Sequence, residues 1–438
     1  MKRVIASAGA FAVGMAGLHG ANVTGLTPQE QSKWWIVSGS LRTFYDDNSL
    51  NAPADSAVPS FGIEFKPGIA INLPYEQTLI SASYDFTLNY YEARPDSKVD
   101  QDHFFDVRFN HKFTERYEAD VQNSFIYSDA PQILDTGGAI TTTQRRGDSS
   151  GLRNRATIDF NARLTPVAGL ASGYKNNLRD YKQTGVGSYS ALLDSIEQLF
   201  HIDAQLFPSE HTVLFVGYQF GFIDYTSSDP LGYTYVGGTL PGNGRPPGSG
   251  SSTNQVAVLP DTKNNTSHYL YVGGRREFSR QLSGAGKIGL QFTDYYNLSQ
   301  TSWSPYLDLT STYEYLPGSS GQLGLSVGRI PTDVVGVSAT NGSVTLDGLA
   351  ASAYATLTHR FTSRITGICY LNYQHTVYNG GDFDGQTADY VTIDTRLDYK
   401  LRENFFADLG YIWTHNLSSI PNSSFNRNRV YIGVRATY

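Results

Sequence analysis

Segments of about ten residues in which apolar and polar side chains alternate recur along the chain. In the segment 80–90, Ile80 and Tyr84 fall on one face and Asp85 falls on the other. A period of two residues predicts a β-strand, because successive side chains of a strand point to opposite faces. The same alternation is found at 103–113, 152–164, 390–401 and 429–438. Ordinary half-buried sheets alternate too, so no single segment identifies the fold.

A short sequence motif, which we call a turn mark, closes every second predicted strand. It consists of a Phe or Leu followed by a tight polar or Pro-containing turn. These marks are Leu73, Phe113, Leu164, Phe207, Phe278, Leu316, Phe361 and Leu401. Longer connections separate them, at 46–59, 92–101, 129–150, 181–194, 226–266, 295–303, 331–344, 379–387 and 416–427. Short turns at one end and long loops at the other are typical of transmembrane β-barrels.

Eight turns and nine loops join eighteen strands, an even number that places both chain ends on the short-turn side. A count of 16 strands also fits. The marks are mostly about 40 residues apart, which is also the period of soluble propellers. Blades of a propeller would have loops of similar length, and these differ several-fold. We therefore predict an all-β protein, a transmembrane antiparallel up-and-down β-barrel over residues 34–438, whose closure leaves no edge strand in lipid.

Composition agrees with a barrel and excludes a helical membrane protein. The mean hydropathy is -0.32 and 17% of residues are charged. No run of roughly 18 apolar residues, as a membrane-spanning helix requires, follows residue 21. A barrel tolerates this average because its outer face is apolar and its lumen is polar.

The N-terminus has the layout of a secretory signal. Lys2 and Arg3 precede an apolar run from 4 to 18, and small residues follow at Gly20 and Ala21. We expect a signal peptide at 1–21 and a short periplasmic lead at 22–33. Loss of the two cations would change the formal charge from -7 to about -9 (-7 minus 2), which argues against nucleic acid as a partner. The single cysteine, Cys369, excludes a disulfide framework within the chain.

The C-terminal strand carries the last distinctive pattern. Its alternate residues, including Val434 and Tyr438, lie on one face, and the chain ends on an aromatic residue. Together with the signal peptide, the eighteen strands and the FTER-like turns, the terminal RVYIGVRATY resembles the β-barrel porins of Gram-negative bacteria, in particular the type-two putative porin family. The resemblance implies location in the bacterial outer membrane, with both termini periplasmic and Val434 and Tyr438 read as a membrane-assembly signal by the barrel-assembly machinery.

The polar faces of the predicted strands would line the lumen, and their charges are mixed. The pore-lining candidates are Arg42, Lys66, Asp85, Asp106, Arg108, Asp120, Arg153, Arg155, Asp159, Arg163, Asp394, Arg396 and Asp398. Glu64, Asp408 and Arg429 fall on the same faces. Isolated charges in a dry core would be costly, so these residues favour a wet interior. We expect a channel for passive diffusion of small hydrophilic solutes such as ions and sugars. The alternative is an outer-membrane barrel component of exopolysaccharide export or envelope assembly, which would work with polysaccharide export proteins; the resemblance implies such a role in some relatives.

The longest predicted loop, 226–266, is rich in Gly, Pro and Ser and includes Tyr233, Tyr235 and Arg245. Such loops are usually functional or disordered. Its low charge favours an external loop over one that folds inward as a constriction. The inward-facing tyrosines are expected to pack against the wall, although they could also stack on sugars; they are Tyr306, Tyr354, Tyr370 and Tyr431.

Signals for catalysis and metal binding are weak. The pentapeptide 324–328 matches G-x-S-x-G around Ser326, but it lies in an alternating strand, and that chemistry needs a strand-to-helix turn. The nine histidines lack metal-ligand spacing. We therefore predict no catalytic residue, no metal and no cofactor. Besides outer-membrane lipid, a partner left open is a second copy of the chain, because the small residues Ala351, Ala353 and Ala355 form a weak candidate for a homotrimer contact.

Overall fold

The computed structural model describes residues 34–95, 97–129, 150–235, 255–334, 336–338 and 342–438. The predicted signal peptide and lead lie outside the described residues. Eighteen strands form one closed antiparallel sheet, so the predicted all-β barrel and its strand count are confirmed. No helix in the described part of the chain is long and apolar enough to cross a membrane.

The barrel strands follow one another in chain order. The first nine are β1 (Trp35–Asp46), β2 (Ser60–Pro74), β3 (Thr78–Tyr91), β4 (Val99–Lys112), β5 (Tyr117–Ser128), β6 (Gly151–Ala162), β7 (Ala168–Tyr181), β8 (Ser195–Ser209) and β9 (Thr212–Tyr225). The other nine are β12 (Asn265–Glu277), β13 (Leu282–Tyr295), β14 (Gln300–Leu316), β15 (Ser319–Ile330), β16 (Asp347–Arg360), β17 (Ile365–Asn379), β18 (Thr387–Arg402), β19 (Phe405–Ser418) and β20 (Phe425–Thr437). Between β9 and β12, β10 (Gly232–Tyr235) and β11 (Gln255–Val258) form a separate two-stranded sheet.

The barrel closes where β1 pairs with β20. Ser38 lies opposite Thr437, and Asp46 lies opposite Arg429. Beyond the last pair, the backbone N–H of Val37 donates to the carbonyl oxygen of Tyr438 at 3.0 Å, and the N–H of Tyr438 donates back at 2.8 Å. Closure pairs the backbone groups that an open sheet would leave exposed at its two edges, which is what a membrane-spanning sheet requires.

Several of the turn marks share one local structure. After Phe113, the Thr114 hydroxyl accepts hydrogen bonds from the backbone N–H groups of Arg116 and Tyr117, at 3.1 and 3.2 Å. Thr165, Ser279 and Thr362 make the same pair of bonds in their turns. A hydroxyl that satisfies two backbone donors replaces water at the tip of the turn and favours a tight hairpin at these positions.

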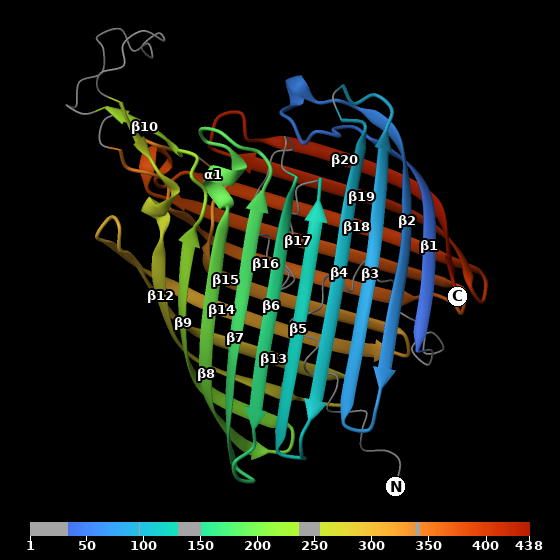
Figure 1. Ribbon diagram of the computed structural model, residues 1–438. Coiled ribbons are helices and arrows are strands. Elements are labelled where there is room, and N and C mark those ends of the chain that lie inside the picture. The colour runs from blue at the N-terminus through green and yellow to red at the C-terminus, as the bar shows by residue number, and fades with distance from the viewer. Residues whose placement is uncertain (1–33, 96, 130–149, 236–254, 335, 339–341) are drawn as a thin grey trace.

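The described parts of the long connections lie at the other end of the barrel, at the top of Figure 1 for the strands nearest the viewer. One predicted loop, 295–303, is wrong in extent, because β13 ends at Tyr295 and β14 begins at Gln300. Trp303 is 67% exposed on the outward face and Ser304 is buried, so strand alternation continues through this segment. The cluster of aromatic and polar residues there is a strand end rather than a loop.

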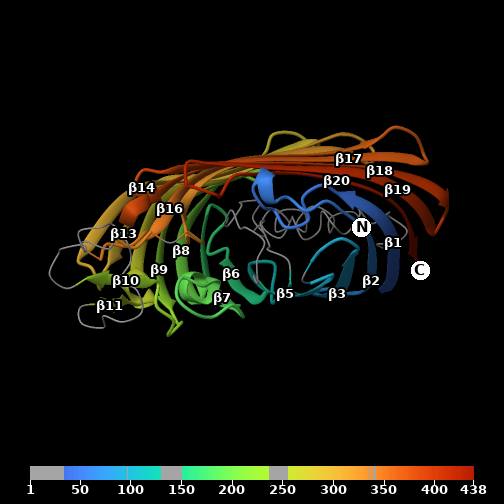
Figure 2. The same ribbon diagram turned by 90° about the horizontal axis from the view of Figure 1, so that it is seen from above.

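The two faces of the sheet differ as the sequence pattern predicts. Outward positions carry exposed apolar side chains, such as Leu41 at 51% and Leu270 at 65%. A continuous apolar surface of this kind needs a non-aqueous neighbour. Seen from above, the barrel has an oval cross-section, with β3 to β8 on one long wall and β17 to β20 on the opposite one (Figure 2).

Candidate functional site: the lumen wall

The structure places most of the predicted pore-lining residues on the inner face of the barrel, opposite the exposed apolar side chains, and their role in lining a conducting pore stays a prediction. Twelve of the thirteen lie on strands β1–β6 and β18, at positions that alternate with exposed apolar residues. The twelve are Arg42, Lys66, Asp85, Asp106, Arg108, Asp120, Arg153, Arg155, Asp159, Asp394, Arg396 and Asp398.

Arg163 is the exception. β6 ends at Ala162, so Arg163 lies in the exposed turn that follows. Its guanidinium lies 5.0 Å from the centre of the Phe207 ring and donates to the carbonyl oxygen of Pro166 at 2.8 Å. The prediction was wrong for this residue because alternation in the sequence continues past the point where the chain turns.

An ion-pair cluster spans the seam where the barrel closes. We name Arg42, Glu64, Asp408 and Arg429 the seam cluster. Arg42 contacts Glu64 at 2.9 Å and Asp408 at 2.6 Å, and Arg429 contacts the other oxygen of Glu64 at 3.0 Å. The side chain of Asp408 is only 1% exposed, so its charge depends on Arg42 for compensation.

Aromatic rings hold the arginines of the seam cluster from the side. The guanidinium of Arg42 lies 4.7 Å from the centre of the Tyr431 ring, and that of Arg429 lies 3.8 Å from the centre of the Phe44 ring. Cation–π contacts of this type fix the plane of a guanidinium while leaving its N–H groups free to bond carboxylates. On β18, Arg396 lies 3.1 Å from Asp398 and extends the same wall of charges.

The opposite wall carries its own pairs. Arg108 donates to Asp120 through Nε at 3.0 Å and Nη2 at 2.7 Å. His201 lies 3.7 Å from Asp159 on the neighbouring part of the wall. Strands β6 and β18 lie on opposite walls of the oval lumen (Figure 2). Arg153 and Arg155 belong to the first of these strands, and Arg396 belongs to the second.

Two further pairs lie near the long-loop end and were not among the predicted residues. Arg329 contacts Asp347 at 2.6 Å, and Arg179 contacts Glu197 at 3.5 Å. Alternation along β7 places Arg179 on the same face as the buried Tyr181. That signal was present in the sequence, whereas the partners of these arginines depend on strand register.

Two of the four inward tyrosines pack on glycines of the neighbouring strand. A Cβ atom on Gly324 would lie 2.1 Å from the Tyr354 ring, and one on Gly410 would lie 2.2 Å from the Tyr431 ring. Each ring therefore lies flat along the wall, in space that only glycine leaves open. This contact supports packing over a sugar-stacking role for Tyr354 and Tyr431, although both rings still face the lumen.

The loops at the long-loop end share a small apolar core. A short helix, α1 (Tyr189–Leu193), packs Leu192 and Leu193 against Leu231, Val258 and Leu346, and we name this group the mouth core. Three separate loops supply its members, so packing here fixes the loops to one another around one side of the opening (Figure 2).

A fully buried cation lies beside the mouth core. The ammonium of Lys263 donates to the carbonyl oxygen of Leu192 at 2.8 Å and lies 4.3 Å from the centre of the Tyr225 ring. Burial lowers the pKa of Lys263 to about 7. Burial raises the pKa of the loop residue Asp333 to about 7. Both groups therefore titrate near neutral pH, and both belong to the loops at the end of the barrel that carries the mouth core.

The predicted constriction loop is described only at its two ends. Tyr233 lies in β10 and is 43% exposed, and Tyr235 is the last residue of the same strand. β10 and β11 stand at the rim of the barrel rather than across its centre (Figure 2). Arg245 lies outside the described residues.

The G-x-S-x-G match lies in the middle of strand β15. The hydroxyl of Ser326 shares a hydrogen bond of 2.7 Å with that of Ser352 on β16. Within the described residues, no group of three or more His, Cys, Asp or Glu side chains is arranged to hold a metal ion. The wall presents charged and hydrogen-bonding groups to the inside of the barrel.

Part of the chain matches one family of known proteins. Residues 334–438, which contain β16 to β20, match the family described as putative beta-barrel porin 2. No curated protein matches the chain.

Several solved outer-membrane proteins are similar at low identity. The outer-membrane protein OpdK from Pseudomonas aeruginosa is 12% identical, with a TM-score of 0.42, over 92% of this chain and 99% of that one. OccAB4 from Acinetobacter baumannii is 10% identical, with a TM-score of 0.41, over 94% and 100%. A BenF-like porin from Pseudomonas fluorescens Pf-5 is 10% identical, with a TM-score of 0.43, over 92% and 99%.

The closed eighteen-strand sheet has the architecture that the predicted resemblance implies, and the last five strands of the chain match the putative beta-barrel porin 2 family.

Proposed function

We propose that the barrel is a channel for passive diffusion of small hydrophilic solutes, including ions and sugars. The observation that carries this proposal is the lumen wall, where side chains of both charges form ion pairs and take the place of the apolar contacts of a dry core. A barrel of about eighteen strands is wide enough to enclose an aqueous lumen. Paired charges on opposite walls offer hydrogen bonds to neutral and ionic solutes alike.

The pairing of the charges predicts weak ion selectivity. Arg42 and Arg429 are matched by Glu64 and Asp408, and Arg108 is matched by Asp120. A wall on which each cation has a nearby anion produces a small net field along the channel axis. We therefore expect similar permeability to small cations and anions, with size as the main filter.

We also propose an orientation in the membrane. Both ends of the described chain lie at the short-turn end, which we assign to the periplasm, and the long loops then face the exterior. Val434 and Tyr438 are 38% and 67% exposed on the outward face of the last strand. That position is suited to recognition by the barrel-assembly machinery. A homotrimer contact at the outward alanines of β16 stays a prediction.

A planar-bilayer recording tests the channel. Full-length protein refolded in detergent should give discrete conductance steps, and a KCl gradient across the membrane should give a reversal potential close to zero. A heat-denatured sample of the same preparation is the control. Absence of steps from correctly folded protein would overturn the proposal, and a strongly shifted reversal potential would overturn the weak selectivity.

A further inference from the structure

Six histidines occupy outward positions on the barrel strands. They are His103, His111, His268, His359, His375 and His415. This face otherwise carries exposed apolar side chains. A titratable ring in contact with lipid tails would be costly when charged, so its depth in the membrane matters.

The histidines lie at two levels. His103 and His111 are eight residues apart on β4. Across the β16–β17 pair, His375 lies opposite Ala351, which is eight residues from His359. At about 3.3 Å per residue and a strand tilt of about 40°, eight residues span roughly 20 Å of membrane depth. The apolar band of such barrels is about 25 Å tall, so the two levels lie near its borders, where lipid headgroups begin.

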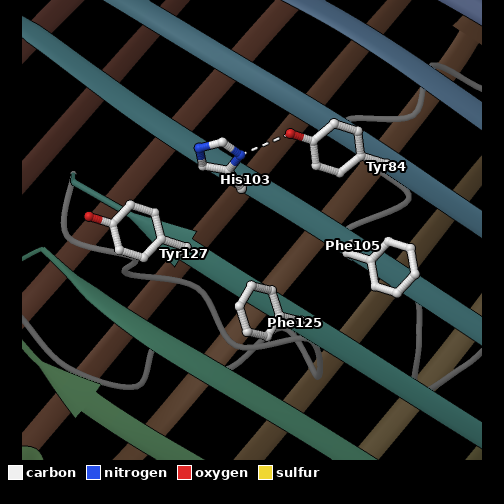
Figure 3. Close-up of a pocket in the computed structure, with 5 residues that line it drawn as sticks. All are labelled: Tyr84, His103, Phe105, Phe125 and Tyr127. Carbon is white, nitrogen blue, oxygen red and sulfur yellow. Dashed lines mark hydrogen bonds between the residues drawn. The ribbon is translucent and has the colours of Figure 1, made fainter.

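His103 lies at the border on the long-loop side, above a shallow aromatic groove. Its Nδ1 and the hydroxyl of Tyr84 share a hydrogen bond of 2.9 Å, and the ring of Tyr127 is 5.8 Å away. Phe105 and Phe125 line the groove with these three residues (Figure 3). Because Nδ1 is engaged by tyrosine, Nε2 is the ring nitrogen left for an external partner.

The charged groups near His103 come from the segments just past β5 and β7. The hydroxyl of Tyr127 on β5 contacts both Asp129, at 3.2 Å, and the ammonium of Lys182. These two opposite charges meet at one hydroxyl and offset each other. On β3, the contacts to His103 are the rings of Tyr84 and Phe86. Among the described residues, the direct contacts of His103 are aromatic rings and the Tyr84 hydroxyl, with no carboxylate.

His268 repeats this environment on another side of the barrel. It shares a hydrogen bond of 2.7 Å with the hydroxyl of Tyr218, and the rings of Phe220 and Phe292 lie 5.2 and 6.3 Å away. The outward carboxylates on its two neighbouring strands are Asp294 on β13, two residues beyond Phe292, and Asp224 on β9, four residues beyond Phe220.

His375 differs from both. Its Nδ1 bonds to the carboxylate of Asp389 at 2.9 Å, and Asp389 also accepts from Tyr373 at 2.7 Å. The positive charge of His375 thus has a counter-ion inside the protein.

We propose that His103 and His268 bind the phosphate of an anionic lipid headgroup, with the acyl chain of that lipid lying against the aromatic rings beside each histidine. A histidine ordinarily gains its positive charge as the pH falls from about 8 to 5. The charged ring then donates from Nε2 to a phosphate oxygen at the border of the apolar band. Lipid binding therefore strengthens on acidification. The proposal is independent of whether the lumen conducts.

Thermal unfolding of the full chain in neutral detergent micelles tests the proposal. Phosphatidylglycerol is added at pH 5.5 and at pH 7.5, and the rise in the unfolding midpoint is compared. For the native protein we expect the rise at pH 5.5 to exceed that at pH 7.5 by about 2 °C or more, since a ligand stabilises the state it binds. The double variant His103→Gln/His268→Gln keeps a group that can accept from tyrosine but cannot gain charge, and it should lose most of this difference; His359, whose Nδ1 bonds to Tyr315 at 2.8 Å near the short-turn border, accounts for the remainder. His375→Gln is the matched control and should keep it.

Three outcomes overturn the proposal. They are equal rises at the two pH values for the native protein, a difference that persists undiminished in the double variant, and an equal rise with inorganic phosphate alone, which would indicate an ion site without a lipid chain. Lipid A in place of phosphatidylglycerol distinguishes the source, because a larger rise with lipid A assigns the site to the outer leaflet. If the double variant does not fold, the single variants His103→Gln and His268→Gln are measured in its place, and each should lose part of the difference.

Discussion

The seam cluster makes the sharpest prediction, because removal of one cation leaves a buried carboxylate without a partner. In Arg42→Gln, Glu64 still has Arg429 at 3.0 Å, whereas Asp408 loses its ion pair at 2.6 Å. The Asp408 side chain is 1% exposed, and its other oxygen makes no hydrogen bond. Breaking a buried pair in this way costs about 3–5 kcal/mol, so we expect a loss near the lower end, since the lumen offers some water.

The assay is denaturant unfolding of the barrel in lipid vesicles, with the single variants and the double variant Arg42→Gln/Asp408→Asn. The double variant should recover most of the loss, because neither side chain is then charged. Arg42→Lys should be milder than Arg42→Gln, since it keeps the charge but loses the forked geometry. Equal stability of Arg42→Gln and the double variant would refute the role assigned to Asp408. The same Arg42→Gln channel should also shift its reversal potential toward cation selectivity.

Two further predictions concern packing and pH. Gly324→Ala should destabilise the barrel by about 1–3 kcal/mol in denaturant unfolding, because its Cβ would lie 2.1 Å from the Tyr354 ring; Gly328→Ala on the same strand, with nothing within 4 Å of its Cβ, should be nearly neutral. The pKa of Asp333 is raised by burial from 3.8 to about 7, so between about pH 4 and 7 the folded loop keeps a proton that the unfolded loop has lost. Stability of the mouth core should therefore fall as the pH rises through this window, seen as faster amide hydrogen exchange in α1 after correction for intrinsic rates. Asp333→Asn should reduce that change, and the buried Asp194 at the end of α1, whose pKa burial raises to about 6, should account for the remainder. The exposed Asp382→Asn should leave the change intact; an unchanged profile in Asp333→Asn would contradict the assignment.

The strands and turns follow from local chemistry, and the sequence is sufficient to predict them. Alternation such as that of Tyr84 and Asp85 has one periodicity that fits a strand between lipid and water. The turn after Phe113 is encoded by Thr114, whose hydroxyl bonds two backbone donors within three residues. Because these interactions link neighbours in the chain, they can be recognised without knowing the fold. The failures at Arg163 and at 295–303 are errors of boundary, where alternation and turn signals overlap.

The sequence was sufficient to predict that most of the charged residues lie on the inner face, because the alternation within each strand decides on which face of the sheet a residue lies. It was not sufficient to predict their partners, because a partner depends on which strands meet and in what register. Arg42 and Asp408 are 366 positions apart and touch only because β1 and β20 close the barrel beside β19. The packing of Tyr354 and Tyr431 on glycines and the three loops of the mouth core likewise depend on long-range pairing. The sequence by itself thus determined the class of fold, the strand count and the polarity of each face. The tertiary structure alone decided which charges neutralise one another, because ion pairing depends on distances that only closure of the barrel sets.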